Sequence, residues 1–196
     1  MSRRRTTSKT PDWDALYSIA DAQSGHFTTA QAATAGYSPQ LLHKHLASRR
    51  IARVRRGVYR VTHFPAAEHE DLVVLWLWAE HVGVFSHQTA LALHDLSDML
   101  PTRAYMTLPE DWRGRRLRVP EGLVLHFVDV EDRDCEWLDA VPITSPRRTL
   151  RDCIDAHVSP DLVQQALRQA RQRGLVSKAE GGRLTKRLAR SMGETR

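Results

Sequence analysis

Residues 27–61 read FTTAQAATAGYSPQLLHKHLASRRIARVRRGVYRV, and helix caps, a glycine turn and a hairpin follow one another along them. Thr28 and Gln31 have the T-x-x-Q spacing of a capping box, in which two side chains satisfy free backbone groups at a helix start. The alanine-rich helix that begins there ends at Gly36. Ser38 opens the next helix as a cap, with proline in the first helical position. This order predicts two short helices joined by a glycine-containing turn.

An earlier helix completes the motif. Thr10 followed by proline is a helix start, and Trp13, Leu16, Tyr17 and Ala20 recur at helical spacing after it. Three helices with a glycine-containing turn between the second and the third predict a helix-turn-helix.

The third helix separates its side chains by face. At about 100° per residue, one side carries Leu41, Leu42, His45 and Leu46, and the other carries Gln40, His43, Lys44 and Ala47. Glutamine pairs bidentately with adenine, lysine reaches guanine or a phosphate, and a small alanine permits close approach. The second side is therefore the one expected in a DNA major groove.

A basic hairpin follows. Residues 51–55 alternate apolar and basic, Arg56-Gly57 supplies a tight turn, and residues 58–61 alternate back. Strict alternation places Arg53 and Arg55 on one face, Arg56 at the tip and Arg60 on the return strand. Such a wing behind a helix-turn-helix gives a second DNA contact, to phosphates or the minor groove.

Charge divides the chain into three parts. The 196 residues have a net charge of +6, but residues 1–63 carry +8, residues 64–146 carry −9 and residues 147–196 carry +7. The sign changes at the turn-rich residues 62–65. We therefore expect a basic disordered tail over residues 1–10, a winged helix over 11–63 and a second domain over 64–196.

The concentration of positive charge in the first part favours DNA binding. The alternative is a protein-binding module in which DNA binding is incidental, because a charge run is often only a solvated face. The candidate DNA-binding residues are Arg3, Arg4, Arg5, Thr29, Ser38, Gln40, His43, Lys44, Arg49, Arg53, Arg55, Arg56 and Arg60.

The second domain is predicted to be α+β, with a small sheet flanked by helices. The overall fold class is thus α+β, an N-terminal winged helix-turn-helix followed by an α+β domain. Helices are expected over 66–81, 87–96, 146–156, 160–173 and 177–192, and strands over 104–108, 123–128 and 141–144.

Three cations of this domain lie where cations are disfavoured. Arg147, Arg148 and Arg151 occupy the first turns of a helix, at the positive end of its dipole. They call for an anion, either the acidic loop 129–139 or an external one such as nucleic acid or an acidic partner, and we place the internal pairing first. A further basic face, formed by Arg183, Lys186, Arg187 and Arg190, is predicted near the C-terminus.

No catalytic or metal-binding pattern emerges. The sequence has no glycine-rich phosphate loop, and its two cysteines exclude a four-thiolate zinc site. The acidic run at 131, 132, 134 and 136 resembles a divalent-metal site, but such loop carboxylates are usually solvated. With no apolar stretch long enough for a membrane span and no secretory signal, we expect a cytoplasmic protein without a cofactor, a metal or enzymatic activity.

Several segments together resemble the AbiE-type antitoxins of type IV toxin–antitoxin systems. They are FTTAQA at 27–32 with GYS at 36–38, RVRRGVY at 53–59, SHQTAL at 86–91 and ITSPRRTL at 143–150. The resemblance covers about residues 12–156.

This resemblance implies a winged-helix repressor of its own operon that binds inverted repeats of double-stranded DNA, and hence two copies on the DNA. It also implies that the second domain counteracts a nucleotidyltransferase-like toxin. Some related chains continue into a nuclease-like domain; because this sequence stops at residue 196, we expect no nuclease activity.

Overall fold

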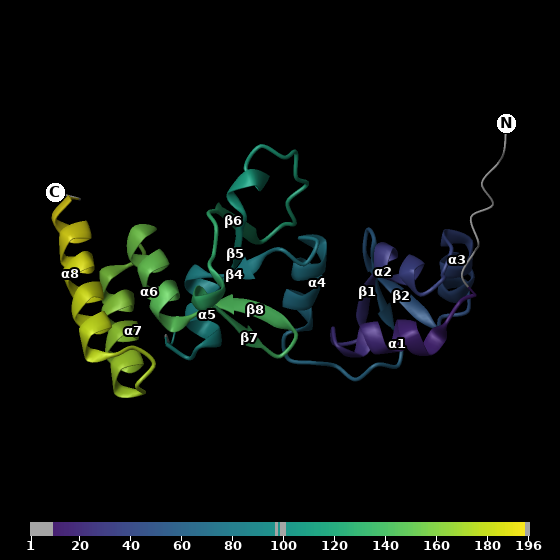
Figure 1. Cartoon of the computed structure of the whole chain (residues 1–196), viewed down its shortest axis with the longest axis horizontal. Helices are drawn as coiled ribbons and strands as arrows, with labels where there is room; N and C mark the ends of the chain where they lie inside the picture. Colours follow the sequence, from purple (N-terminus) through teal and green to yellow (C-terminus); the bar gives the residue numbers. More distant parts are fainter. Residues whose placement is uncertain (1–9, 97, 99–100, 195–196) are drawn as a thin grey trace. The chain divides into compact units, whose positions relative to one another are not determined.

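The computed structural model describes residues 10–96, 98 and 101–194. The chain divides into two compact units, of which the first ends at His81 and the second begins at Val82 (Figure 1). The charge pattern placed the boundary at residues 62–65 instead. The boundary lies later because helix α4 (Glu70–Trp78) belongs to the first unit. This helix is largely buried and contacts strands β1 and β3.

The described residues of the first unit, 10–81, form a three-stranded sheet and four helices. Its strands are antiparallel and have the order β1-β3-β2. The predicted winged-helix architecture is confirmed, while the three-residue strand β1 was not predicted, because so short a run has no visible alternation. The elements are α1 (Trp13–Asp21), β1 (His26–Thr28), α2 (Thr29–Thr34), α3 (Pro39–Ala47), β2 (Ile51–Arg55), β3 (Val58–Val61) and α4.

The first helix begins later than predicted. Its N-cap is Asp12 rather than Thr10, and the Asp12 carboxylate accepts a hydrogen bond from the Ala15 backbone N–H at 2.9 Å. A carboxylate also interacts favourably with the positive helix end, which gives Asp12 an advantage over a hydroxyl. Leu16 and Ala20 then lie fully buried, as the helical spacing predicted.

One apolar core supports the first unit. Leu16, Phe27, Leu42 and Ile51 are buried together, and they come from α1, β1, α3 and β2. Gly25 has a φ of +82°, and an added Cβ would lie 2.5 Å from the Phe64 ring. Only glycine therefore fits where the chain turns from α1 into β1.

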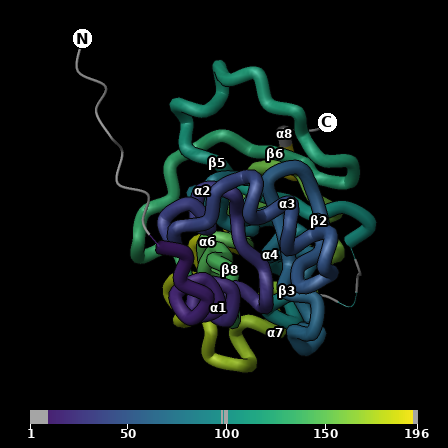
Figure 2. Tube along the Cα trace, turned by 90° about the vertical axis from the view of Figure 1, so that its right-hand side faces the viewer, coloured from purple at the N-terminus to yellow at the C-terminus, as the bar shows by residue number. Residues whose placement is uncertain are grey.

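The second unit contains a five-stranded mixed sheet with the order β6-β5-β4-β8-β7. The strand pairs β5–β6 and β4–β8 are parallel, and β4–β5 and β7–β8 are antiparallel. The connection between β5 and β6, residues 109–122, projects from the sheet as a long loop (Figures 1 and 2). The strands are β4 (Val84–Phe85), β5 (Ala104–Leu108), β6 (Leu123–Phe127), β7 (Cys135–Leu138) and β8 (Val141–Thr144).

Helices complete the second unit. Leu91, Leu150, Ile154, Val163 and Leu184 belong to one apolar cluster that joins α5, α6, α7 and α8. The predicted α+β class is confirmed, and the strands β4 and β7 are additions to the predicted strands. The helices are α5 (His87–Leu93), α6 (Pro146–Asp155), α7 (Pro160–Gln172) and α8 (Lys178–Glu194), with 3₁₀ turns at Glu110–Trp112 and Asp132–Asp134.

None of the helices in the described part of the chain is long and apolar enough to cross a membrane.

Candidate nucleic-acid interface

Helix α2 starts with the predicted capping box. The Thr28 hydroxyl accepts a hydrogen bond from the Gln31 N–H at 3.1 Å, and the Gln31 side-chain oxygen accepts one from the Thr28 N–H at 2.8 Å. After α2, Gly36 has a φ of +85° and reverses the chain. Ser38 then caps α3 by accepting a hydrogen bond from the Leu41 N–H. The helix-turn-helix geometry thus rests on local hydrogen bonds at both helix starts.

A hydrogen-bond network of Gln23, Gln31 and His81 fixes the start of α2. The Gln31 side-chain amide donates to the Gln23 side-chain oxygen at 2.8 Å, and His81 Nε2 lies 3.1 Å from the same oxygen. Burial lowers the pKa of His81, so the ring is neutral near pH 7 and acts as a hydrogen-bonding group. The network fixes the start of α2 to the segment after α4. The sequence did not indicate it, because its other members lie 50 residues or more from His81.

Helix α3 buries one side and exposes the other. Leu42 is buried, and the neighbouring leucines pack against the same core. The residues predicted to face outward, Gln40, His43, Lys44 and Ala47, are all exposed. The predicted separation into two faces is therefore confirmed.

The far end of α3 is fixed by aromatic contacts. His45 packs against Trp13 and Tyr37, with ring centroids 5.8 and 5.6 Å apart. Burial lowers the pKa of His45, and the positive charges of Arg50 and Lys44 lower it further. The Arg50 guanidinium also lies over the Trp13 ring at 4.7 Å, a cation–π contact. These contacts hold α3 against α1.

The predicted hairpin is present but contains a β-bulge. Arg53 pairs with Tyr59 and Arg55 with Val58, so β2 has one more residue than β3 between these pairs. As a result Ala52, Arg53 and Val54 are exposed in succession, which strict alternation does not produce. The bulge interrupts the strict alternation on which the assignment of Arg53 and Arg55 to one face was based, and that assignment stays a prediction.

The tip of the wing lies beside the start of α2. Gly57 has a φ of +80°, and its carbonyl accepts a hydrogen bond from the Thr29 N–H at 2.9 Å. The Thr29 hydroxyl reaches the same carbonyl at 3.4 Å. Helix α3 packs beside strand β2, so the recognition-helix candidate and the wing are held next to each other in the first unit (Figure 2).

Most wing arginines have no acidic partner among the described residues. Arg49, Arg53, Arg55 and Arg56 form no ion pair there. Arg60 differs, because its guanidinium forms an ion pair with Glu70 at 3.2 Å and donates to the Phe64 carbonyl at 2.9 Å. Arg60 thus attaches β3 to α4, an internal role that the sequence pattern did not indicate.

The remaining candidate DNA-binding residues fall into two groups. The hydroxyls of Ser38 and Thr29 are already used in the cap and at the wing tip. The basic tail residues Arg3, Arg4 and Arg5 lie outside the described residues.

A second cluster of arginines, in the second unit, is paired internally. Asp134 is buried, and Arg147 forms an ion pair with it, while Arg148 and Arg151 lie 3.5 and 3.6 Å from it. Arg148 also donates to both oxygens of Asp152, at 2.8 and 2.9 Å. The prediction that the acidic loop neutralises these arginines is confirmed. The expectation that the loop carboxylates are solvated is wrong for Asp134.

Two stacked histidines lie near this cluster. His87 and His126 stack with ring centroids 3.6 Å apart, and Ser86 Oγ lies 2.8 Å from His87 Nδ1. Burial lowers the pKa of His87 to about 3, and His126 and Arg148 add to the effect. Both rings are neutral near pH 7, since burial lowers the pKa of His126 as well.

Within residues 10–96, 98 and 101–194, no three His, Cys, Asp or Glu side chains are placed to hold a metal ion. Burial raises the pKa of the Cys153 thiol far above its ordinary value, so this thiol stays protonated. The buried, unreactive cysteine agrees with its predicted structural role.

The N-terminal geometry agrees with a family comparison. Residues 14–62, from α1 to the end of the wing, match the model of a family described as a transcriptional regulator, AbiEi antitoxin. No match to the chain is found among curated proteins. Over residues 14–62 the family match supports the resemblance to AbiE-type antitoxins that the sequence indicated, and the segments of that resemblance beyond residue 62 lie outside the match.

Proposed function

We propose that the winged helix binds double-stranded operator DNA and that the protein represses transcription of its own operon. The observation that supports this most directly is the exposed polar side of α3, a helix that packs beside strand β2 of the wing. Arg53, Arg55 and Arg56 of that wing form no ion pair with a described residue. A helix fixed by its leucines and presenting a polar face has the form of a recognition helix.

Each part of this surface has a chemical role in the proposal. Gln40 is suited to a bidentate contact with adenine, and Lys44 to guanine or a phosphate. His43, next to them on the exposed side, supplies a further hydrogen bond. Ala47 leaves space for the groove wall or a thymine methyl group. These contacts read base sequence.

The wing supplies affinity without base reading. Arg53, Arg55 and Arg56 carry positive charges that no described carboxylate neutralises, so binding phosphates breaks no internal ion pair. Their contacts release counterions and make binding depend strongly on salt. The bulge in β2 supports this role, because it exposes Arg53 and Val54 at a strongly twisted part of the hairpin.

The regulatory role follows from the family. An AbiEi antitoxin that regulates transcription is expected to bind an inverted repeat with two copies, because a two-fold operator matches two protein subunits. We propose that the second unit counteracts a nucleotidyltransferase-like toxin without catalysis of its own.

The test measures binding of the full chain to the DNA upstream of its own gene, at several salt concentrations. The variant R53Q/R55Q/R56Q should bind all DNA sequences more weakly. The slope of log affinity against log salt should fall by about 0.9 for each phosphate that the wing no longer neutralises. The matched control is R103Q/R116Q/R118Q, which removes the same charge from exposed sites of the second unit.

The proposal fails if the wild-type chain does not prefer the upstream region over unrelated DNA. It also fails if both triple variants reduce affinity equally, because net charge alone would then explain the binding. Co-purification with a neighbouring toxin that survives the wing substitutions, without DNA binding, would favour the protein-binding alternative.

A further inference from the structure

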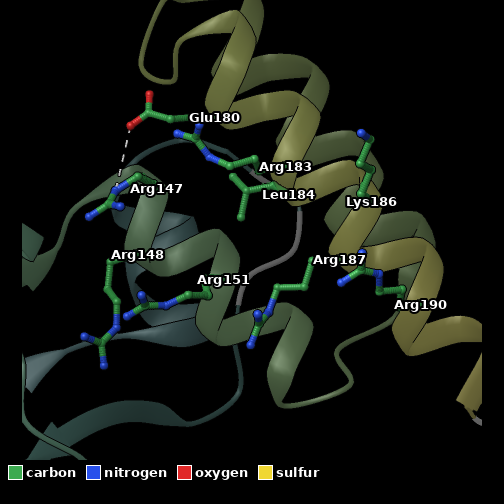
Figure 3. A pocket seen from close by; sticks show the side chains of 9 residues that line it. All are labelled: Arg147, Arg148, Arg151, Glu180, Arg183, Leu184, Lys186, Arg187 and Arg190. Atoms are coloured by element: carbon green, nitrogen blue, oxygen red, sulfur yellow. Dashed lines mark ion pairs between the residues drawn. The ribbon is translucent and has the colours of Figure 1, made fainter.

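The second unit contains a strongly basic pocket between α6 and α8. Its volume is about 350 Å³, and Figure 3 shows its lining side chains, with Arg148 and Arg151 on the α6 side and Arg187 and Arg190 on the α8 side. Leu184 is the single apolar residue among those that line it. The pocket is lined by Arg147, Arg148, Arg151, Glu180, Arg183, Leu184, Lys186, Arg187 and Arg190.

Internal pairing accounts for only part of this charge. The α6 arginines are neutralised by Asp134 and Asp152, Glu180 lies 3.9 Å from Arg147, and Arg187 forms an ion pair with Asp155. Four carboxylates thus serve the seven cations of the pocket. The excess is positive, and its cations are available to an external anion.

The excess charge is concentrated on α8. Arg183, Lys186 and Arg190 are exposed, and none forms an ion pair with a described side chain. They follow one another at helical spacing along one side of α8, over about 10 Å of helix axis. A row of cations of this length suits a ligand with several negative charges in line rather than one compact ion.

A second pocket adjoins the first, and four arginines and the two aspartates Asp152 and Asp155 are among the residues that line it. Its volume is about 620 Å³, and it shares Arg148, Arg151 and Arg187 with the first pocket. It continues to His126, whose buried Nε2 has no hydrogen-bond partner among the described residues. The two pockets therefore adjoin at these arginines, and together they offer a chain-like ligand more room than a single nucleotide needs.

The composition of the first pocket distinguishes between kinds of anionic ligand. Arginine is the dominant cation, and its planar guanidinium matches the oxygens of a phosphate in a bidentate manner. The residues that line the first pocket include no aromatic side chain and little apolar surface, unlike the centre of a typical protein–protein interface. Without rings for stacking or amides for base edges, the first pocket offers contacts to phosphates alone, whereas the rings of His126 and Phe127 line the second pocket.

We propose that the α6–α8 pocket binds the phosphate backbone of a single-stranded nucleic acid, independently of base sequence. A flexible strand can place phosphates within a recessed pocket and along α8, whereas a rigid duplex would meet only the outermost cations. Arg183, Lys186 and Arg190 contact the phosphates, and the paired α6 arginines add positive potential from the floor. This site is separate from the winged helix and does not depend on its proposed function.

The experiment measures fluorescence anisotropy of a labelled single-stranded 12-mer of mixed sequence with the full-length chain, at several salt concentrations. The variant R183Q/K186Q/R190Q should lower the log–log salt slope by about 2, since each phosphate contact in a single strand contributes about 0.7. This slope change corresponds to about 100-fold weaker binding at 0.1 M salt. Single-stranded RNA and DNA are tested in parallel to find which sugar the site accepts.

Two controls separate this site from the rest of the protein. The variant R103Q/R116Q/R118Q removes equal charge from exposed positions of the same unit and should leave the slope nearly unchanged. The wing variant R53Q/R55Q/R56Q should lose duplex binding but retain the single-strand binding. Circular dichroism checks that the α8 variant is folded; its substituted residues are exposed and on a helix that glutamine favours.

Three results would overturn the proposal. The first is single-strand binding that the α8 substitutions leave unchanged. The second is competition by ATP or pyrophosphate as strong as that of the 12-mer, which would indicate a small polyphosphate site. The third is tighter binding of a polyglutamate peptide than of the 12-mer, with the same loss in the α8 variant, which would indicate an acidic protein partner.

Discussion

The arginines of the wing and those of α6 differ in their partners, although both groups come from basic segments. Arg53 and Arg56 are exposed and form no ion pair with a described residue, whereas Arg148 is buried between Asp134 and Asp152. The first group is available to an external polyanion, and the second group supports the fold. Net charge along the chain therefore indicates a binding surface only where no carboxylate of the same fold neutralises it.

The largest effect should come from removing the shared anion of the α6 cluster. Asp134→Ala removes the carboxylate that Arg147, Arg148 and Arg151 share, while the buried Arg148 keeps Asp152 as a partner. We therefore expect a loss of about 3 kcal/mol of unfolding free energy, at the lower end of the cost of breaking a buried ion pair. Urea unfolding, with hydrogen exchange of α6 to report on the second unit, measures it. The control Asp132→Ala alters an exposed neighbour. A loss below about 1 kcal/mol would show that the cluster does not stabilise the unit.

Gln40, on the exposed side of α3, should affect the sequence specificity of DNA binding rather than folding. Gln40→Ala should reduce the preference for the operator over a sequence altered at the contacted base by about 1–3 kcal/mol, because alanine cannot form the bidentate hydrogen bonds. Competition binding with operator variants measures this. Gln172→Ala changes an exposed glutamine of α7 and should have no effect. Equal weakening on every sequence would place Gln40 at a phosphate.

Burial of His87 makes the second unit sensitive to acid. The folded-state pKa of His87 is about 3, below its ordinary value of 6.5, because of burial, His126 and Arg148. Between these pH values the unfolded chain binds a proton that the folded chain does not, so stability is lost as the pH falls below 6.5. The loss approaches about 1.4 kcal/mol per pH unit for this residue.

Urea unfolding at pH 7, 6 and 5 compares the wild type with His87→Gln, which should have the shallower pH dependence. His157→Gln, at an exposed position of the same unit, is the control. Parallel profiles for wild type and His87→Gln would mean that His87 is not responsible.

The smallest changes in stability are expected from substituting one arginine of α6 and one arginine of the wing. Arg147→Gln should cost about 1 kcal/mol of stability, because glutamine cannot form the charged hydrogen bond to Asp134 at this half-exposed site. Arg56→Gln should change stability by less than about 0.5 kcal/mol. Thermal unfolding and DNA binding are measured on both. We expect weaker duplex binding in Arg56→Gln alone, and the reverse pattern would contradict the distinction between the two groups.

Much of the first unit could be predicted, because its signals are local. The Thr28–Gln31 capping box, the Ser38 cap and the two sides of α3 depend on residues within one or two helical turns of each other. The prediction for the wing was less complete, because an inserted residue in β2 changes the alternation without changing its composition.

Other features depend on residues that are distant in the sequence. Nothing near Asp134 indicates burial, since it stands among exposed acidic neighbours, and its burial results from the helix that begins at residue 146. In the sequence Arg60 resembles the other wing arginines, but in the structure Glu70 of α4 lies 3.2 Å from it. The charge pattern also assigned α4 to the second domain, because the charge sign changes before it.

The amino-acid sequence by itself determined the helix-turn-helix, the basic hairpin and the side of α3 that faces outward. These features follow from caps, turns and periodicity, which act over a few residues. The tertiary structure alone decided which arginines are neutralised, to which unit α4 belongs, and that α6 and α8 enclose one basic pocket. The physical reason is that ion pairing and burial depend on distances through space, and these are established only when distant segments pack together.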